Sequence, residues 1–189
     1  RRCAWCIVPR KEGTVRPAAA WDEIRRPDSR EIIFLDNNVL ASEFGVEQIR
    51  RMGGRPLWVD FNQGLDARLI TPEIAGLLAR LRWIRFVRLS CDTSELLPTV
   101  KQAAAYLKEA GIAPSRLWAY TLVRDVDEAH RRVAALRDMG ITPFAQPYRD
   151  YDGSEPTAEQ RAFARWVNKK SVFYSCKWDE FRYPGKEFT

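Results

Sequence analysis

The chain has 189 residues, of which 46% are hydrophobic and 12% aromatic, and this is enough apolar material for one well-packed domain. No segment holds the roughly 18 consecutive apolar residues of a membrane span, and the first six residues resemble neither a signal nor a transit peptide. We therefore expect a soluble, cytoplasmic protein with no membrane partner. The formal charge of +6 favours an anionic partner such as nucleic acid, although a well-solvated basic surface explains it equally well.

The first pattern in the chain is a pair of cysteines, Cys3 and Cys6, separated by two residues. In a cytosolic protein such a pair indicates metal or redox chemistry rather than a disulfide. Three kinds of site remain open at this point: half of a zinc site, a thioredoxin-like redox motif, or part of an iron–sulfur cluster. Cys91 and Cys176 stand alone, and we expect both to be structural residues.

From residue 31 onward, short apolar runs alternate with helical patterns. The runs, each of which predicts a strand, are Glu31–Leu35, Pro56–Phe61, Ile84–Leu89, Leu117–Val123 and Ile141–Gln146. The helical patterns, with apolar residues three and four positions apart, cover Val46–Met52, Pro72–Leu81, Leu96–Ala110 and Val126–Met139. Strands that alternate with helices of this length predict a parallel sheet, either open or curled into a barrel.

One more helical signal follows the fifth strand. Thr157 and Gln160 form a capping box, which predicts a helix that continues through Val167. The residues beyond it are rich in aromatic side chains and show no clear period. We expect a single domain over residues 1–189, in which residues 151–189 form a C-terminal helix and a tail that pack on the α/β core.

Polar side chains follow each predicted strand at the point where it ends. They are Asp36, Asn37 and Asn38; Asp66 and Arg68; Ser90 and Asp92; Arg124 and Asp125; and Gln146. Ligands bind at the carboxyl ends of parallel strands, in open sheets and barrels alike. Each residue has a plain alternative role in a helix cap or turn. Their recurrence favours a ligand site, and we expect Asp36, Arg68, Ser90, Asp92 and Gln146 to converge on one open cleft.

Together these segments resemble the radical S-adenosylmethionine (SAM) superfamily, whose members carry C-x3-C-x2-C after the first strand with an aromatic residue before the last cysteine. The segment Cys3-Ala4-Trp5-Cys6 is similar to the second half of that motif. Phe34–Asn38 resembles the second-strand motif of the methylthiotransferase-like and B12-binding-like branches. Asp66–Arg68 resembles the third-strand acidic-x-Arg element, and Leu89–Ser94 the fourth-strand polar motif. The resemblance covers roughly residues 3–168.

The resemblance implies a partial parallel (β/α)6 TIM-like barrel whose first strand is missing from this chain. It implies that Cys3 and Cys6, with a third cysteine two places before Arg1, ligate a [4Fe–4S] cluster, so that the chain as given would be inactive alone. Cleavage of SAM would then yield a 5′-deoxyadenosyl radical that abstracts hydrogen from an unidentified substrate. The residues implied in SAM binding are Trp5, Asp36, Asn37, Asn38, Asp66, Arg68, Ser90, Asp92 and Gln146. Among them, Arg68 would pair with the SAM carboxylate, and Ser90 and Asp92 with the ribose.

The resemblance also implies an electron donor such as flavodoxin or ferredoxin, and it leaves nucleic acid and peptide open as substrates. Two other functions compete with it: a basic nucleic-acid-binding α/β domain with a degenerate cysteine motif, and a zinc-stabilised structural domain. The basic pairs Arg1-Arg2, Arg25-Arg26, Arg131-Arg132 and Lys169-Lys170 permit the first of these. None of the pairs, however, is interleaved in sequence with aromatic residues as a stacking platform would be.

Overall fold

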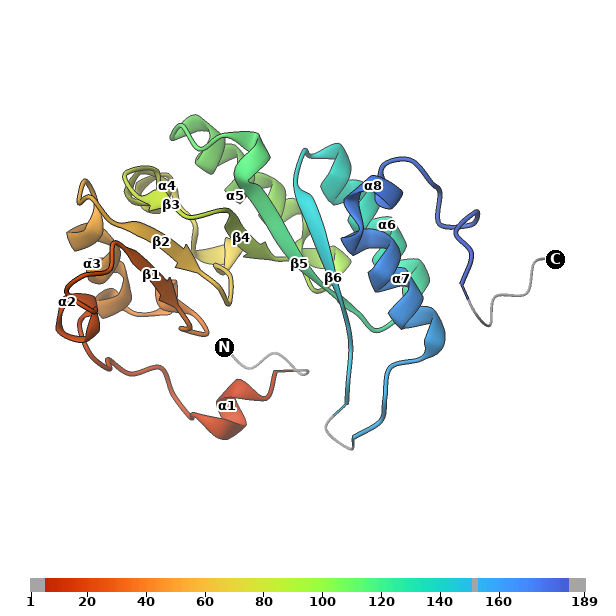
Figure 1. Cartoon of the computed structure of the whole chain (residues 1–189), viewed down its shortest axis with the longest axis horizontal. Coiled ribbons are helices and arrows are strands. Elements are labelled where there is room, and N and C mark those ends of the chain that lie inside the picture. Colours follow the sequence, from red (N-terminus) through yellow and green to blue (C-terminus); the bar gives the residue numbers. More distant parts are fainter. Residues whose placement is uncertain (1–5, 151–152, 184–189) are drawn as a thin grey trace. The chain divides into compact units, whose positions relative to one another are not determined.

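The computed structural model describes residues 6–150 and 153–183 of the chain (Figure 1). Cys3 and Trp5, which were predicted to belong to the cluster loop, lie outside these ranges. The chain divides into two compact units: Arg1–Ser90 with Thr99–Leu117, and Cys91–Pro98 with Trp118–Thr189. Within the described ranges, every helix is too short or too polar to cross a lipid bilayer.

The first unit has helices and strands that alternate from Glu31 to Trp83. Its elements are α1 (Val8–Lys11), α2 (Trp21–Ile24), β1 (Glu31–Phe34), α3 (Glu43–Met52), β2 (Trp58–Phe61), α4 (Pro72–Ala79), β3 (Arg82–Trp83), β4 (Val87–Ser90) and most of α5 (Leu97–Glu109). The predicted start of α4 is confirmed, since the Thr71 hydroxyl accepts a hydrogen bond from the Ile74 N–H at 3.2 Å and Pro72 opens the helix. Ser42 caps α3 in the same way.

The first sheet has the strand order β1-β2-β3, and all of its strands are parallel. Phe34 stacks on its register partner Phe61 with 5.0 Å between ring centroids, and Trp83 meets Phe61 edge-on at 5.7 Å. The Trp83 indole N–H donates to the Leu78 carbonyl at 3.1 Å, which ties β3 to α4. Phe61 and Trp83 are 3% and 5% exposed, and burial of such a side chain contributes about 1.5–3 kcal/mol, so the aromatic stack stabilises the first sheet.

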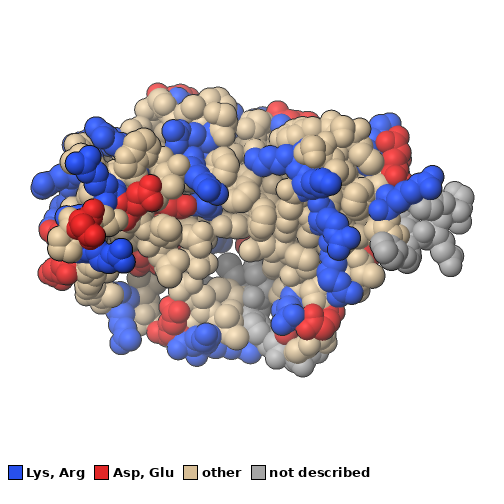
Figure 2. Space-filling model, viewed as in Figure 1, with Lys and Arg blue, Asp and Glu red and all other residues tan. Residues whose placement is uncertain are grey.

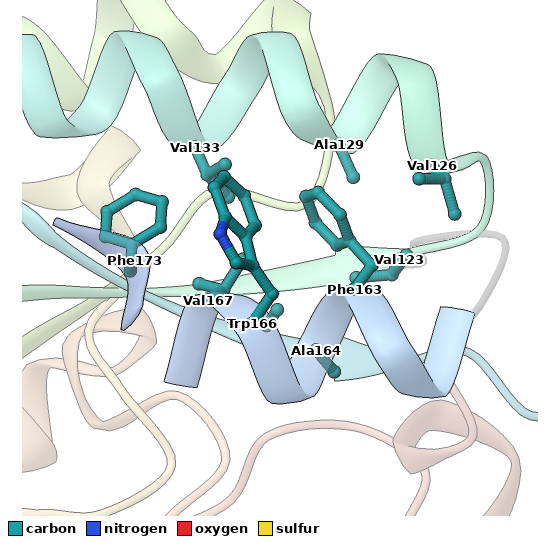
Figure 3. Close-up of a cluster of buried hydrophobic side chains, with 10 residues drawn as sticks. Val123, Val126, Ala129, Val133, Phe163, Ala164, Trp166, Val167 and Phe173 are labelled. Carbon is teal, nitrogen blue, oxygen red and sulfur yellow. The ribbon is translucent and has the colours of Figure 1, made fainter. Parts of the chain in front are cut away.

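The second unit has its own helix-covered core. Its elements are β5 (Leu117–Val123), α6 (Val126–Asp138), β6 (Thr142–Pro147), α7 (Ala158–Asn168) and α8 (Lys170–Phe173), with the first residue of β5 shared with the first unit. The predicted strand Leu117–Val123 and the capping box of Thr157 and Gln160 are both confirmed. Figure 3 shows Val133 of α6 against Trp166 of α7, and Ala129 of α6 above Phe163 of α7, which lies beside the buried Val123 of β5.

One side chain of α7 covers the outer edge of β6. The Asn168 amide accepts a hydrogen bond from the Ala145 N–H at 2.8 Å and donates one to the Ala145 carbonyl at 2.9 Å. These are the two bonds that a neighbouring strand would make with Ala145. The carboxyl end of α7 is therefore anchored beside β6.

The predicted class, α/β with parallel strands, is confirmed, but the partial (β/α)6 TIM-like barrel is wrong. The described strands form two separate three-stranded sheets, β1-β2-β3 and β4-β5-β6, and they do not close into a barrel. Of the predicted strand Ile84–Leu89, only Val87–Leu89 is a strand, within β4 of the second sheet, and Ile84–Phe86 is not. The strand that pairs with β2 in the first sheet is Arg82–Trp83, which precedes the predicted run.

The chain turns sharply after β2, and this turn accounts for the division. Gly64 adopts a positive φ of 86° and its N–H bonds to the Phe61 carbonyl at 3.0 Å, so the strand stops at Phe61. The next residue, Leu65, forms an isolated parallel bridge with Leu89 of β4, and no ladder between β2 and β4 is continuous with it among the described strands. A turn that interrupts the ladder leaves two sheets in place of one curved sheet.

Candidate functional site

The predicted site residues belong to both units. Asp36, Asn37, Asn38, Asp66, Arg68 and Ser90 lie in the first unit, and Asp92 and Gln146 lie in the second. Ser90 is half-buried at the end of β4, Asp36 is exposed after β1, and Gln146 is exposed in β6. The expected convergence of all these side chains on one cleft stays a prediction, while contacts within each unit are defined.

In the first unit, three of the predicted residues meet at the carboxyl ends of β1 and β2. The Asp66 carboxylate is 7% exposed and forms a two-point ion pair with Arg68, with Nε–Oδ1 and Nη2–Oδ2 distances of 2.7 and 3.0 Å. Asp66 also caps the 3-10 turn Ala67–Leu69 by accepting the Arg68 N–H at 3.1 Å. Asn38 Nδ2 donates to Asp66 Oδ2 at 3.4 Å. Asp66 therefore acts as a cap, and it also lies in contact with Asn38 and Arg68, two other residues of the predicted site.

The other end of the Asn38 side chain is an unsatisfied acceptor. Its Oδ1 is buried and has no hydrogen-bond partner among the residues that the structure describes. A buried polar atom without a partner costs about 1–3 kcal/mol, and a bound N–H group would recover that cost. Asn38 Oδ1 therefore fits a ligand that donates a hydrogen bond beside the Asp66 carboxylate.

The segment that follows the cysteine pair is tied to the same region. Asn37 Nδ2 donates to Glu12 Oε2 at 2.8 Å, and Glu12 directly follows helix α1. Cys6, a free and half-buried cysteine, stands two residues before α1. The hydrogen bond thus connects the region after Cys6 with the loop that carries Asn37 and Asn38.

A buried ion pair in the first unit was not predicted. Asp60 on β2 pairs with Arg88 on β4, and both side chains are only 8% exposed. Both residues interrupt apolar runs, in the segments WVDF and VRLS, and a charge inside a buried strand is the signal that would have identified them. Buried charges of this kind are stable only when they are paired, so Asp60 and Arg88 depend on each other.

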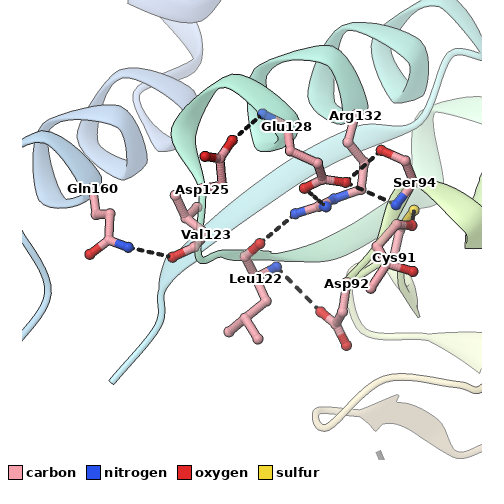
Figure 4. A network of polar contacts seen from close by, with 10 residues as sticks. Cys91, Asp92, Ser94, Leu122, Val123, Asp125, Glu128, Arg132 and Gln160 are labelled. Atoms are coloured by element: carbon pink, nitrogen blue, oxygen red, sulfur yellow. Dashed lines mark hydrogen bonds and ion pairs between the residues drawn. The ribbon is translucent and has the colours of Figure 1, made fainter. Parts of the chain in front are cut away.

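The loop after β4 is held by a polar network in the second unit (Figure 4). Asp92 Oδ1 accepts the Leu122 N–H at 3.3 Å. Glu128 Oε1 accepts both the backbone N–H and the hydroxyl of Ser94, at 2.9 and 2.5 Å. Arg132, which is fully buried, pairs with Glu128 and donates to the Leu122 carbonyl. These contacts give Asp92 a structural role at the end of β5, and its predicted ribose contact stays a prediction.

Cys91 lies in the interior beside this network. It is fully buried, as expected for a structural cysteine, and burial raises the pKa of its thiol to about 12 despite the opposing positive charge of Arg132. A thiol with such a pKa stays protonated at neutral pH, and a protonated thiol is a poor nucleophile and a poor metal ligand. Cys91 is therefore a packing residue.

No grouping of three or more His, Cys, Asp or Glu side chains within residues 6–150 and 153–183 could hold a metal ion. Cys3, one of the two predicted cluster ligands, lies outside those ranges. The assignment of Cys3 and Cys6 as cluster ligands thus rests on the sequence motif.

Comparison of the chain with protein-family models, with curated proteins and with solved structures found no match.

Proposed function

We propose that this chain is the core of a radical SAM enzyme. The observation that carries the proposal is the buried, unsatisfied Oδ1 of Asn38, which lies next to the Asp66–Arg68 ion pair. When bound, the cluster would supply the electron that cleaves SAM to a 5′-deoxyadenosyl radical, which abstracts hydrogen from a substrate. The substrate itself is not specified by these residues.

The charges at this site complement the methionine part of SAM. That part carries an ammonium group, which donates hydrogen bonds, and a carboxylate, which accepts them. Asn38 Oδ1 and the Asp66 carboxylate suit the ammonium, and the planar guanidinium of Arg68 suits the carboxylate. The two-point ion pair with Asp66 fixes the orientation of the Arg68 guanidinium before a ligand arrives. Such preorganisation reduces the entropic cost of binding.

The cysteine motif supports the same proposal independently of the contacts among Asn38, Asp66 and Arg68. Cys3 and Cys6 would provide two thiolate ligands, and a cysteine two places before Arg1 in a longer chain would provide the third. The hydrogen bond between Glu12 and Asn37 supports a cysteine segment that lies near the SAM-binding residues. Trp5, next to Cys6, would contact the adenine.

Anaerobic reconstitution of the full-length protein with iron and sulfide tests the proposal. We expect a [4Fe–4S] absorbance and spin signal, and production of 5′-deoxyadenosine when SAM and a reductant are added. Cys3→Ala and Cys6→Ala should each abolish both signals. Cys176→Ala is the matched control, because Cys176 lies in the second unit, and it should retain both. A Cys3 or Cys6 variant that kept its full iron content and still made 5′-deoxyadenosine would overturn the proposal.

A further inference from the structure

Strands β5 and β6 present aromatic side chains on the side opposite to their helices. Along β5, Ala119, Thr121 and Val123 are fully buried, and Val123 packs in the core formed with α6 and α7. The alternate residues Trp118 and Tyr120, with Phe144 from β6, are half-buried and point the other way. The ring centroid of Phe144 lies 5.0 Å from that of Trp118 and 5.8 Å from that of Tyr120. We refer to these three rings as the aromatic face.

A row of exposed basic side chains runs along α7 and into α8. It consists of Arg161, Arg165, Lys169 and Lys170, and we refer to it as the basic stripe. The first three are spaced four residues apart, so they recur on successive helical turns over about 12 Å. Figure 2 shows Lys and Arg side chains gathered in a run over this part of the second unit.

Arg161, Arg165 and Lys169 of the basic stripe carry positive charge that no carboxylate within the described part of the chain pairs with. The described contact of the Arg161 guanidinium is a hydrogen bond to the Pro156 carbonyl, which leaves its charge in place. A polyanion would therefore meet these side chains without having to displace an internal carboxylate.

The carboxyl end of the basic stripe lies beside the aromatic face. Asn168, at the end of α7, bonds to both backbone groups of Ala145 and so fixes the stripe against β6. Lys170, at the end of the stripe, places its Nζ 5.9 Å from the centre of the Trp118 ring. Cations and stackable rings are thus adjacent, although they come from segments about 50 residues apart.

We propose that this surface binds single-stranded nucleic acid, with bases stacked on the aromatic face and backbone phosphates along the basic stripe. Rings that accept planar bases beside a track of cations are the recurring pattern of single-strand binding. A duplex keeps its bases stacked in its interior, so it could contact the basic stripe but could not place bases on the aromatic face. The proposal does not depend on the radical SAM function, and it would supply that function with a nucleic-acid substrate or partner.

Fluorescence anisotropy with a labelled 12-nucleotide oligouridine tests the basic stripe, with the full chain as the binding protein. We expect Arg165→Ala/Lys169→Ala to weaken binding by about tenfold or more at low salt. The salt slope of log K should fall in magnitude by about 1.4, since each phosphate contact on a single strand contributes about 0.7. The matched control, Lys101→Ala/Arg131→Ala, removes two exposed charges elsewhere and should bind as the parent does.

Trp118→Leu tests the aromatic face separately, because it retains an apolar side chain and removes the ring. We expect weaker oligouridine binding with an unchanged salt slope, and a melting curve like that of the parent shows that the variant is folded. If Trp118→Leu fails to fold, the comparison of Arg165→Ala/Lys169→Ala with its control variant still tests the proposal. Equal binding by Arg165→Ala/Lys169→Ala and the parent would overturn the proposal. So would equally tight binding of a 12-base-pair duplex, heparin or vesicles of anionic phospholipid, or no binding of oligouridine.

Discussion

Asn38 Nδ2 donates a 3.4 Å hydrogen bond to Asp66 Oδ2, and this contact leaves Oδ1 of the same amide buried with no partner in the described ranges. The two residues are 28 positions apart and follow different strands of the first sheet. Their contact orients the amide so that its acceptor, and not its donor, is available to a ligand. An incoming ammonium group would therefore be held between an amide oxygen and a carboxylate.

The first prediction concerns this acceptor. Asn38→Ala should weaken SAM binding to the reconstituted full-length protein by about tenfold or more, because a hydrogen bond to a charged group contributes about 1.5–3 kcal/mol. Isothermal titration measures the affinity. Gln63→Ala is the control, since Gln63 is an exposed amide in the loop after β2, and it should change the affinity little. Equal affinities for the two variants would show that Asn38 does not contact SAM.

The second prediction concerns the buried pair Asp60–Arg88. Arg88→Met should lower the free energy of unfolding by about 3–5 kcal/mol, because Asp60 remains as an uncompensated buried charge. The double variant Asp60→Leu/Arg88→Met should recover much of that loss. Urea unfolding measures both.

The exposed pair Arg149–Glu155, with an N–O distance of 2.8 Å and side chains that are 64% and 63% exposed, provides the control. Arg149→Met should cost less than about 1 kcal/mol. If Arg88→Met cost no more than this control, the Asp60 carboxylate would not be held in the interior as described.

The third prediction is a pH dependence that arises from Cys91. Its pKa is raised from 9.0 to about 12 by burial, so the unfolded chain loses the thiol proton at a lower pH than the folded chain. The contribution of this thiol to stability is fully present below pH 9 and is lost as the pH rises toward 12. Between pH 8 and pH 10, the parent should therefore lose about 1 kcal/mol more than Cys91→Ala does.

Urea unfolding of the parent and of Cys91→Ala at the two pH values measures this difference, because lysines and tyrosines titrate alike in both proteins. Alkylation gives an independent check, since iodoacetamide should modify the half-buried Cys176 much faster than Cys91 in the folded protein. Identical pH profiles for the two proteins would contradict the inferred burial of the thiol.

The fourth prediction compares two helical glycines. A Cβ atom at Gly45 in α3 would lie 2.0 Å from the Val39 carbonyl oxygen, a backbone atom that cannot move aside cheaply. A Cβ at Gly76 in α4 would have no neighbour within 4 Å. Gly45→Ala should therefore destabilise the protein by more than about 2 kcal/mol, while Gly76→Ala should stabilise it by about 1 kcal/mol through helix propensity. Thermal denaturation distinguishes the two, and a stable Gly45→Ala variant would contradict the close approach of α3 to Val39.

Local patterns predicted the elements of this chain better than their assembly. The strand Leu117–Val123, the helix start at Pro72 and the cap at Thr157 depend on neighbouring residues alone, and they were predicted correctly. The barrel depended on pairing between β2 and β4, which the turn at Gly64 interrupts. A one-residue change of backbone direction has no signature in hydrophobic periodicity, and so the division into two sheets could not be anticipated.

The site shows the same contrast. Asp66 and Arg68 are two residues apart, and their grouping could be predicted from the sequence, whereas the contact between Asn38 and Asp66 required the fold. Arg131 and Arg132 form one basic pair in the sequence, yet Arg131 is exposed while Arg132 is fully buried against the Leu122 carbonyl. The aromatic face was missed because its rings come from β5 and β6, while Lys170, the cation beside Trp118, comes from α8.

The Asn168 amide has a consequence for the association of this protein with itself. The N–H and carbonyl of Ala145 both point to the outer edge of β6. The backbone groups of Pro143 and Pro147, two residues away on either side, point to the same edge. The prolines have no N–H to offer, and the Ala145 N–H is already bonded. Between Pro143 and Pro147 this edge therefore has no donor with which to recruit a strand from another molecule. The chain thus prevents intermolecular sheet growth and aggregation at β6 with two imino acids and one amide.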